Sequence, residues 1–358
     1  MYTSFWKVKP YESEELRRYM CSSLYREETD EQYAASGYWA DLCRRTFVAL
    51  NGDVVMLRSG HRFIAETTLD NRSLGGKVRN GLIRMGSRTG TLLGVLARVH
   101  SYIGRSLEAA EEMKRRRLYR EIVARLRFPG ESSQRGREVV PGILSEAVRY
   151  NESKVYDSIE NISYIERVVE TNASPQVFLE IGAGAGLTSL LLIDRVRNSR
   201  VVICDLPVTI CVGYTLACFF GRSRNLRVLL PHQVSKEVLN TDLFEIALIT
   251  PDQLGLLGVS SVDGIINVHS MQEMRIDTIR SYFRLIGRVG KERGFFFCKN
   301  LERSRQYGDT IMENYPWEIL GEIIVDDVAE YATAAYAGGR EAVRIRIVRV
   351  GKSGERGE

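Results

Sequence analysis

The fold is decided by the stretch Gln176-Val177-Phe178-Leu179-Glu180-Ile181-Gly182-Ala183-Gly184-Ala185-Gly186. Its first half is a run of mostly apolar, strand-forming residues, and its second half is a glycine-rich turn. Helix-compatible residues follow at once, from Leu187 to Ile193. A buried strand, a tight loop and a helix in this order open a βαβ unit. We therefore predict an α/β fold whose parallel sheet begins with Val177–Ile181.

The glycine turn is suited to hold a polar or anionic ligand. Glycine has no Cβ, so backbone N–H groups can approach a ligand, and the following helix N-terminus adds partial positive charge. A dinucleotide site requires G-x-G-x-x-G/A, but Gly186 comes one position early and Leu187 occupies the place that must be small. Glu180 instead completes E-x-G-x-G-x-G, which is similar to the S-adenosylmethionine (SAM) loop of class I methyltransferases. The alternative is a glycine turn without a ligand.

The whole chain has the composition of a soluble globular protein. Its 358 residues, 44% hydrophobic and 27% charged, suit one large domain or two ordinary ones. No apolar run approaches a membrane span, and the first residues lack the apolar core of a signal peptide, so we expect a cytoplasmic protein. A net charge of +5 tolerates an anionic partner without demanding nucleic acid. None of the six cysteines forms a C-x-x-C pair, which favours reduced thiols over a metal cluster.

Residues 1–150 are expected to be mostly helical, with one strand pattern at Asp53–Leu57. Residues at helical spacing run through Tyr11–Arg26, Tyr38–Leu50, Thr89–Ile103 and Leu107–Leu126. The last of these has a basic face, which is either solvated or a groove for a phosphate-bearing donor such as a nucleotide-sugar. The N-terminal region would either cap the acceptor site or form a homodimer interface, and the sequence does not rank the two.

The second domain, residues 151–350, carries the sheet, and residues 351–358 are expected to be a flexible tail. A helix within Asn151–Glu170 leads into the first strand, and Asn225–Leu230 could add a short strand. The remaining predicted strands are Arg200–Cys204, Phe244–Thr250, Val262–Asn267, Gly294–Asn300 and a closing pair, Glu322–Val325 with Ala342–Val350.

Two segments after the glycine loop are expected to contact a bound SAM. Asp205 ends the second strand about 20 residues after the loop, where a carboxylate can accept hydrogen bonds from both ribose hydroxyls; it could equally cap the next helix. Thr250-Pro251-Asp252-Gln253 ends the third core strand, where an adenine edge would be read. The predicted cofactor contacts are Glu180, Gly182, Ala183, Gly184, Gly186, Asp205, Leu206, Pro251, Asp252, Gln253 and Asn267.

The joint pattern over roughly residues 150–330 resembles the sugar O-methyltransferase family. The motifs are E-I-G-A-G-A-G from Glu180, V-I-C-D-L-P from Val202, D-G-I-I-N-V-H-S-M-Q-E-M from Asp263, Tyr282-Phe283, F-F-F-C-K-N from Phe295 and Asn314-Tyr315-Pro316-Trp317. The resemblance implies a Rossmann-like, seven-stranded class I methyltransferase sheet, SAM as donor, and a hydroxyl of a sugar or glycoconjugate as acceptor. Residues 1–150 match no named motif.

His269 is the first choice as general base. A sugar hydroxyl is weakly acidic, so a base beside the attacking oxygen should help, and His269 lies just past Asn267 at the tip of strand four. The alternative is a histidine that only packs against a loop. Glu273, four residues on and on the same helical face, would orient His269 or be the base itself; otherwise it pairs with Arg275 or Lys299.

Other polar and aromatic residues of this half could hold a sugar. No carboxylate cluster predicts a metal. An aromatic pair beside proline forms either a sugar platform or part of the core. The candidates are Ser270, Gln272 and Asn300 for hydroxyl groups, and Tyr315 and Trp317 for the platform.

Three rival functions are weaker. A base N-methyltransferase usually offers N/D-P-P-Y/F after strand four, where this chain has Asn267-Val268-His269-Ser270. A dehydrogenase is opposed by the glycine spacing. A scaffold that lost activity is opposed by the intact loop and Asp205. We therefore predict a SAM-dependent O-methyltransferase, with another small-molecule acceptor, nucleic acid or a scaffold role as alternatives.

Overall fold

The structure is a computed structural model, and the chain falls into two compact units, Met1–Ala65 with Asp157–Glu358, and Glu66–Tyr156. The expected division after residue 150 differs from these bounds and stays a prediction. All elements given below belong to the first unit. The described residues are 2–7, 10–21, 47–51, 54–59, 154, 157–169, 175–196, 198–219, 225–235, 239, 244–304, 310–330, 332–333 and 341–351.

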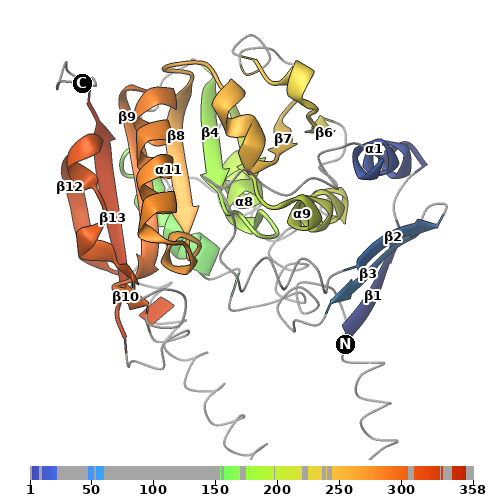
Figure 1. The fold of residues 1–358 in the computed structure, drawn as a ribbon, viewed down its shortest axis with the longest axis horizontal. Coiled ribbons are helices and arrows are strands. Elements are labelled where there is room, and N and C mark those ends of the chain that lie inside the picture. The colour runs from blue at the N-terminus through green and yellow to red at the C-terminus, as the bar shows by residue number, and fades with distance from the viewer. Residues whose placement is uncertain are drawn as a thin grey trace, which may run out of the picture. The chain divides into compact units, whose positions relative to one another are not determined.

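An eight-stranded sheet forms the centre of the first unit (Figure 1), in the order β12-β13-β9-β8-β4-β5-β7-β6. Neighbouring strands in the run β6-β7-β5-β4-β8-β9 pair in parallel. At the other end of the sheet, β13 pairs antiparallel with β9, and β12 pairs antiparallel with β13. Neighbouring parallel strands end at the same edge, where ligands of open α/β sheets bind. The strands are β4 Gln176–Ile181, β5 Ser199–Cys204, β6 Leu226–Val228, β7 Ile246–Ile249, β8 Val262–Val268, β9 Gly290–Leu301, β12 Gly321–Val328 and β13 Val343–Val350.

The sheet confirms the predicted Rossmann-like α/β class and corrects its strand count. Every predicted core strand is present to within a few residues. The eighth strand is β6, which pairs with β7 at the edge of the sheet over Leu226–Val228. This strand lies within Asn225–Leu230, the possible short strand of the sequence, so the sheet has one strand more than the expected seven.

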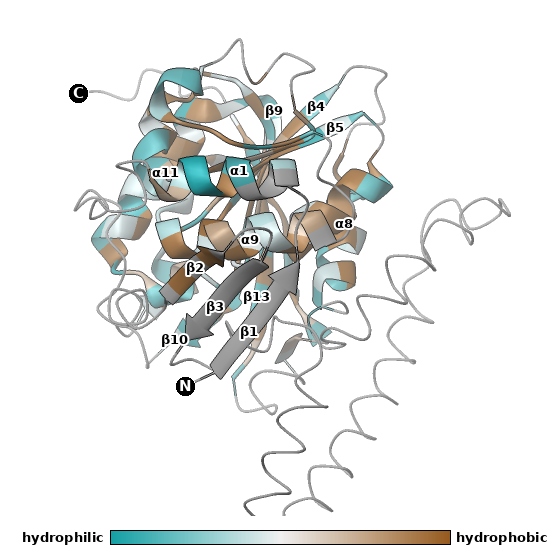
Figure 2. Cartoon of the chain, turned by 90° about the vertical axis from the view of Figure 1, so that its right-hand side faces the viewer, coloured by the Kyte–Doolittle hydropathy of each residue, from teal (hydrophilic) through white to brown (hydrophobic). Residues whose placement is uncertain are grey.

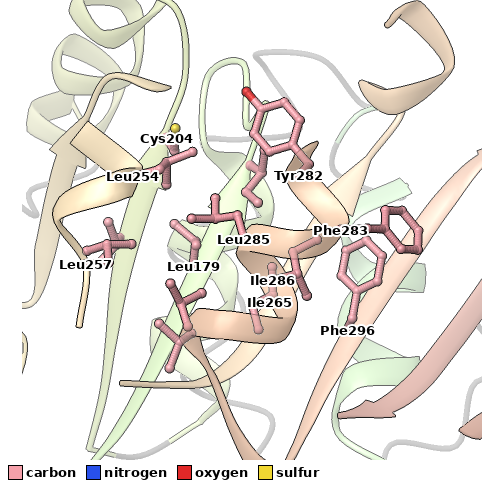
Figure 3. Packing of buried hydrophobic residues seen from close by; sticks show 14 of the residues in the cluster. Leu179, Cys204, Leu254, Leu257, Ile265, Tyr282, Phe283, Leu285, Ile286 and Phe296 are labelled. Carbon is pink, nitrogen blue, oxygen red and sulfur yellow. The ribbon is translucent and has the colours of Figure 1, made fainter. Parts of the chain in front are cut away.

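Helices and short 3-10 turns connect the strands. Ile279, Phe283 and Ile286 of α11 are fully buried, and their spacing of four and three residues places them on one helix face. Figure 3 shows Phe283 beside Phe296 of β9, and their ring centroids are 5.5 Å apart. The elements are α8 Leu187–Arg195, α9 Pro207–Phe219, η2 Pro231–Gln233, η3 Pro251–Leu256, η4 Met271–Glu273, α11 Ile276–Val289, β10 Arg303–Ser304, β11 Thr310–Ile311, η5 Met312–Asn314 and η6 Trp317–Ile319.

Tyr315 and Trp317 belong to the core. Both are buried, and their rings stack 5.7 Å apart. The Trp317 ring also meets Phe283 edge-on at 5.2 Å, and its Nε1 donates a hydrogen bond to the Met312 carbonyl. The proposed sugar platform is therefore wrong, because these rings pack against α11 and β9.

The described part of the first 59 residues contains more strand than expected. It forms β1 Tyr2–Lys7, α1 Pro10–Met20, β2 Phe47–Asn51 and β3 Val54–Ser59, with the three strands paired antiparallel in the order β1-β3-β2. The helix predicted over Tyr38–Leu50 is wrong at its end, where an apolar run beside Asn51-Gly52 pairs with β3 instead. The predicted helices beyond residue 60, their basic face, and the tail after Gly351 lie outside the described residues.

Helix α1 covers the outer strand of the large sheet. Glu15 accepts a hydrogen bond from the Val228 N–H at 3.1 Å, and Arg18 donates to the Val228 carbonyl at 3.0 Å. The two side chains also pair with each other at 2.9 Å. In Figure 2, α1 carries teal hydrophilic residues, whereas α9 is brown and white. Side chains of α1 thus satisfy backbone groups that an edge strand leaves open.

Membrane-spanning helices, metal sites and cysteines can be assessed for the described residues. Among the described residues, no helix is long and apolar enough to cross a membrane, and no group of histidine, cysteine, aspartate or glutamate could hold a metal. Cys204, Cys211 and Cys298 are free and buried, and Cys21 is free and exposed.

Candidate functional site

The glycine loop joins β4 to α8 at the carboxyl edge of the sheet. Gly182, Gly184 and Gly186 have φ values of 69°, 59° and 74°, the left-handed region that favours glycine. A Cβ at Gly182 would lie 2.1 Å from the Ser270 hydroxyl oxygen, so a side chain does not fit there. At Gly184 a Cβ would meet nothing within 4 Å. The loop is therefore tight against β8 and open at Gly184, as a close ligand approach requires.

Asp205, at the end of β5, is held against this loop. Its carboxylate accepts the N–H of Gly184 at 2.5 Å and that of Leu206 at 2.6 Å. Burial raises the pKa of Asp205 to about 6, although the hydrogen bonds from Gly184, Leu206 and Thr209 act in the opposite direction. A carboxylate has about four acceptor positions, so these three hydrogen bonds leave capacity for one from a ribose hydroxyl. The structure brings the predicted loop and acid together.

Glu180 lies beneath the loop. Its buried carboxylate accepts hydrogen bonds from the backbone N–H of Ser189, at 3.1 Å, and from the Ser189 hydroxyl. Gly186, at the N-cap of α8, has no side chain to supply this bond. Burial raises the pKa of Glu180 to about 7. The described contacts of Glu180 thus stabilise the start of α8, where we had predicted a direct cofactor contact.

The segment predicted to contact adenine has two buried residues, Pro251 and Gln253, and one exposed residue, Asp252. Gln253 is buried, accepts the Thr250 N–H at 2.8 Å and donates to the Leu229 carbonyl at 2.7 Å. It therefore holds the start of η3 in place. Pro251 is buried as well, whereas Asp252 is exposed. Asp252 is the exposed one of the three, and its contact with adenine stays a prediction.

Asn267 ties strands β8, β4 and β9 together. It is fully buried, donates to the Ile181 carbonyl at 2.9 Å and accepts from Asn300 at 2.9 Å. Gln272 joins the same network: its N–H donates to the Asn300 side chain at 3.1 Å, and its side-chain oxygen accepts the Leu301 N–H at 2.7 Å. Asn300 and Gln272 therefore brace the floor of the site. Asn300 is fully buried, so its expected contact with a sugar hydroxyl is wrong, whereas that of Gln272 stays a prediction.

His269 follows β8 at the same edge of the sheet. Its backbone is left-handed, with φ 56°, and its N–H donates to the Lys299 carbonyl at 2.7 Å. Non-glycine residues in this region cost free energy and gather at functional sites. The side chain is 16% exposed, so solvent or a substrate can reach it, and Nε2 lies 3.4 Å from an oxygen of Asp157.

Lys299 holds Asp157 in place from the other side. The buried Lys299 ammonium donates to Asp157 at 2.8 Å, to Glu160 at 2.6 Å and to the side-chain oxygen of Asn161 at 2.9 Å. Burial acts to lower the pKa of Lys299, but the two carboxylates raise it above its ordinary value. Asn161 in turn donates to Thr188 in α8 at 3.2 Å. The helical segment 157–165 thus connects the glycine loop's helix with β9.

The structure corrects two predictions about Glu273. His269 is left-handed and η4 begins only at Met271, so His269 and Glu273 do not share a helical face. Lys299, one of the two alternative partners considered for Glu273, pairs with Asp157 and Glu160. Asp157 and Glu160 were not among the site residues predicted from the sequence. Glu160 and Asn161 follow Asp157 by three and four positions, a spacing that places all three on one helix face and could have indicated them.

No family model and no curated protein matches the chain. Similar solved structures include phosphoethanolamine N-methyltransferase 2 of Haemonchus contortus with SAM, at 14% identity and a TM-score of 0.39, covering 54% of this chain and 52% of that one. This chain therefore matches about half of that enzyme's length. Geranyl diphosphate methyltransferase with SAM is 11% identical, with a TM-score of 0.39, covering 63% and 94% of the two chains. The [4+2]-cyclase SpnF is 13% identical, with a TM-score of 0.38, covering 53% and 80%. At these identities and TM-scores the likeness assigns no activity.

Proposed function

We propose that the chain is a SAM-dependent O-methyltransferase whose acceptor is a hydroxyl of a sugar or glycoconjugate. The observation that carries the proposal is the pairing of an open, left-handed Gly184 with the carboxylate of Asp205. A nucleoside cofactor that binds at this edge of an α/β sheet needs a backbone it can approach closely and an acid for its ribose hydroxyls. Gly184 would provide the first and Asp205 the second. The E-x-G-x-G-x-G spacing favours SAM over a dinucleotide.

Residues at the loop fit the groups of SAM. Gly184 and its neighbours would lie against the cofactor, Asp205 would bind the ribose hydroxyls, and Asp252 would face the adenine edge. SAM supplies an activated methyl group, which leaves its sulfur as a new bond forms to the acceptor oxygen. The chain would align acceptor and donor, and alignment alone can provide a large share of the acceleration.

The acceptor class rests on the chemistry at His269 and on the sequence resemblance. A weakly acidic hydroxyl benefits from a base at the point of attack, and His269 is a partly exposed imidazole one residue past β8. The resemblance to the sugar O-methyltransferase family over residues 150–330 adds the sugar. Other small molecules remain the second candidate class.

Isothermal titration with SAM, S-adenosylhomocysteine and NAD tests the donor part of this proposal. We expect micromolar binding of the first two ligands and none of NAD. Binding of NAD alone would replace the proposal with a dehydrogenase, and binding of none of the three would favour a scaffold. The acceptor part is tested by transfer of a labelled methyl group from SAM to a panel of methyl glycosides and nucleotide-sugars, with phenols and amines as competing classes.

A further inference from the structure

A buried cluster of charges lies beside the candidate base. Lys299 contributes one positive charge, and Asp157 and Glu160, at 2.8 Å and 2.6 Å from its ammonium, contribute two negative charges. All three side chains are at least 95% buried. Buried charges are costly unless they are compensated. A protonated His269 would add a positive charge beside the carboxylate of Asp157.

His269 is attached to this cluster at two points. Its backbone N–H donates to the carbonyl of Lys299, and its Nε2 faces Asp157 at 3.4 Å. One oxygen of Asp157 meets Lys299 and the other meets His269. The distance to His269 is longer than a hydrogen bond, but catalytic contacts of this kind often tighten when substrate binds.

We propose that Asp157 is the positioning residue for His269: it keeps the imidazole proton on Nε2 and stabilises the imidazolium, so that Nδ1 takes the acceptor's proton. This inference rests on the proposed function. Lys299 fixes Asp157 in the required orientation, as a third group orients the base in other base-assisted sites. Glu160 contacts the same ammonium at 2.6 Å.

The proton and electron pairs balance in this step. The acceptor O–H bond breaks and its proton passes to Nδ1 of His269. The oxygen pair forms the new O–C bond, and the pair of the broken S–C bond stays on sulfur. A positive imidazolium then lies beside the carboxylate of Asp157. Asp157 remains ionised throughout, in the manner of an acid that stabilises an imidazolium without taking its proton.

The tautomer of His269 can be read directly by NMR of the full chain labelled with ¹⁵N-histidine. The chain has four histidines, so the His269 signals are assigned from their loss in His269→Gln. Spectra are recorded, without acceptor, for the wild type, Asp157→Asn and Glu160→Gln at a pH where the imidazole is neutral. Glu160→Gln is the matched control, because it removes the same charge from Lys299.

In the wild type we expect the proton of His269 on Nε2, with Nδ1 unprotonated. Asp157→Asn should shift this equilibrium toward a mixture, and Glu160→Gln should leave it unchanged. A wild-type signal with the proton on Nδ1 would overturn the proposal, even if Asp157→Asn does not fold. Equal effects of both variants would also overturn it. SAM titration of the same samples tests the proposed function separately, because cofactor binding does not depend on the tautomer.

Discussion

The carboxylate of Asp205 lies 2.5 Å from the amide nitrogen of Gly184, although the two residues are 21 positions apart in the chain. This contact joins the end of β5 to the loop after β4, and in the proposed function the ribose of SAM binds beside it. We predict that Asp205→Asn weakens SAM binding about tenfold to a hundredfold, since a hydrogen bond to a charged group contributes about 1.5–3 kcal/mol. Isothermal titration measures this change.

The same residue predicts a pH dependence of SAM binding. Burial raises the pKa of Asp205 to about 6, so its carboxylate takes up a proton, and loses acceptor capacity, as the pH falls through 6. Wild-type affinity should therefore drop between pH 7 and pH 5, and Asp205→Asn should lose this part of the dependence. Parallel titrations at the two pH values check it, and identical pH dependence in both proteins would contradict the ribose role.

Glu180 predicts a pH-dependent stability. Burial raises its pKa from 4.5 to about 7, so between these values the folded state binds the proton more tightly than the unfolded state. Stability from this group is therefore full below about pH 4.5 and is lost as the pH rises through 7. The unfolding free energy of Glu180→Gln minus that of the wild type should therefore increase by up to about 3 kcal/mol from pH 5 to pH 8, because only the wild type loses this contribution. Urea unfolding at both values measures the difference, and a constant difference would refute the buried titration.

Helix α1 offers a matched pair of variants. Glu14 and Glu15 each pair with an arginine three residues on, but Glu15 also accepts the Val228 N–H. Glu15→Ala should lower the unfolding free energy by about 1–2 kcal/mol, because it leaves an edge-strand N–H without its partner. Glu14→Ala should cost less than about 0.5 kcal/mol, as exposed pairs do. Equal losses in urea unfolding would show that α1 does not hold β6.

His269 and Asp157 predict a non-additive kinetic effect. With an acceptor identified from the labelled-methyl panel, His269→Ala should lower kcat about 10²-fold to 10⁴-fold, the range for loss of a general base, with SAM affinity unchanged. Asp157→Asn should lower kcat in the wild type but have little further effect in His269→Ala, because it acts through the imidazole. Effects that multiply fully in the double variant would show that Asp157 acts independently.

The sequence was sufficient for features set by local pattern. Apolar runs located the core strands, and the glycine spacing located the loop, because periodicity and left-handed glycine are properties of short segments. The site's floor was harder to foresee. Lys299 and Asp157 are 142 residues apart, and only the folded sheet brings them together. Tyr315 and Trp317 were ambiguous because an aromatic face packs equally well on a sugar or on Phe283.

The most direct test of the central claim is SAM titration of Gly184→Asn. Asparagine tolerates the left-handed backbone, so the loop should keep its form while the side chain enters the space open at Gly184. Ser260→Asn is the control, since Ser260 is also left-handed, with φ 50°, and exposed before β8 at the opposite edge of the sheet. We predict that Gly184→Asn folds with wild-type stability and loses SAM binding by at least tenfold, while Ser260→Asn binds normally. Wild-type SAM affinity in a folded Gly184→Asn would contradict the placement of the cofactor on this loop.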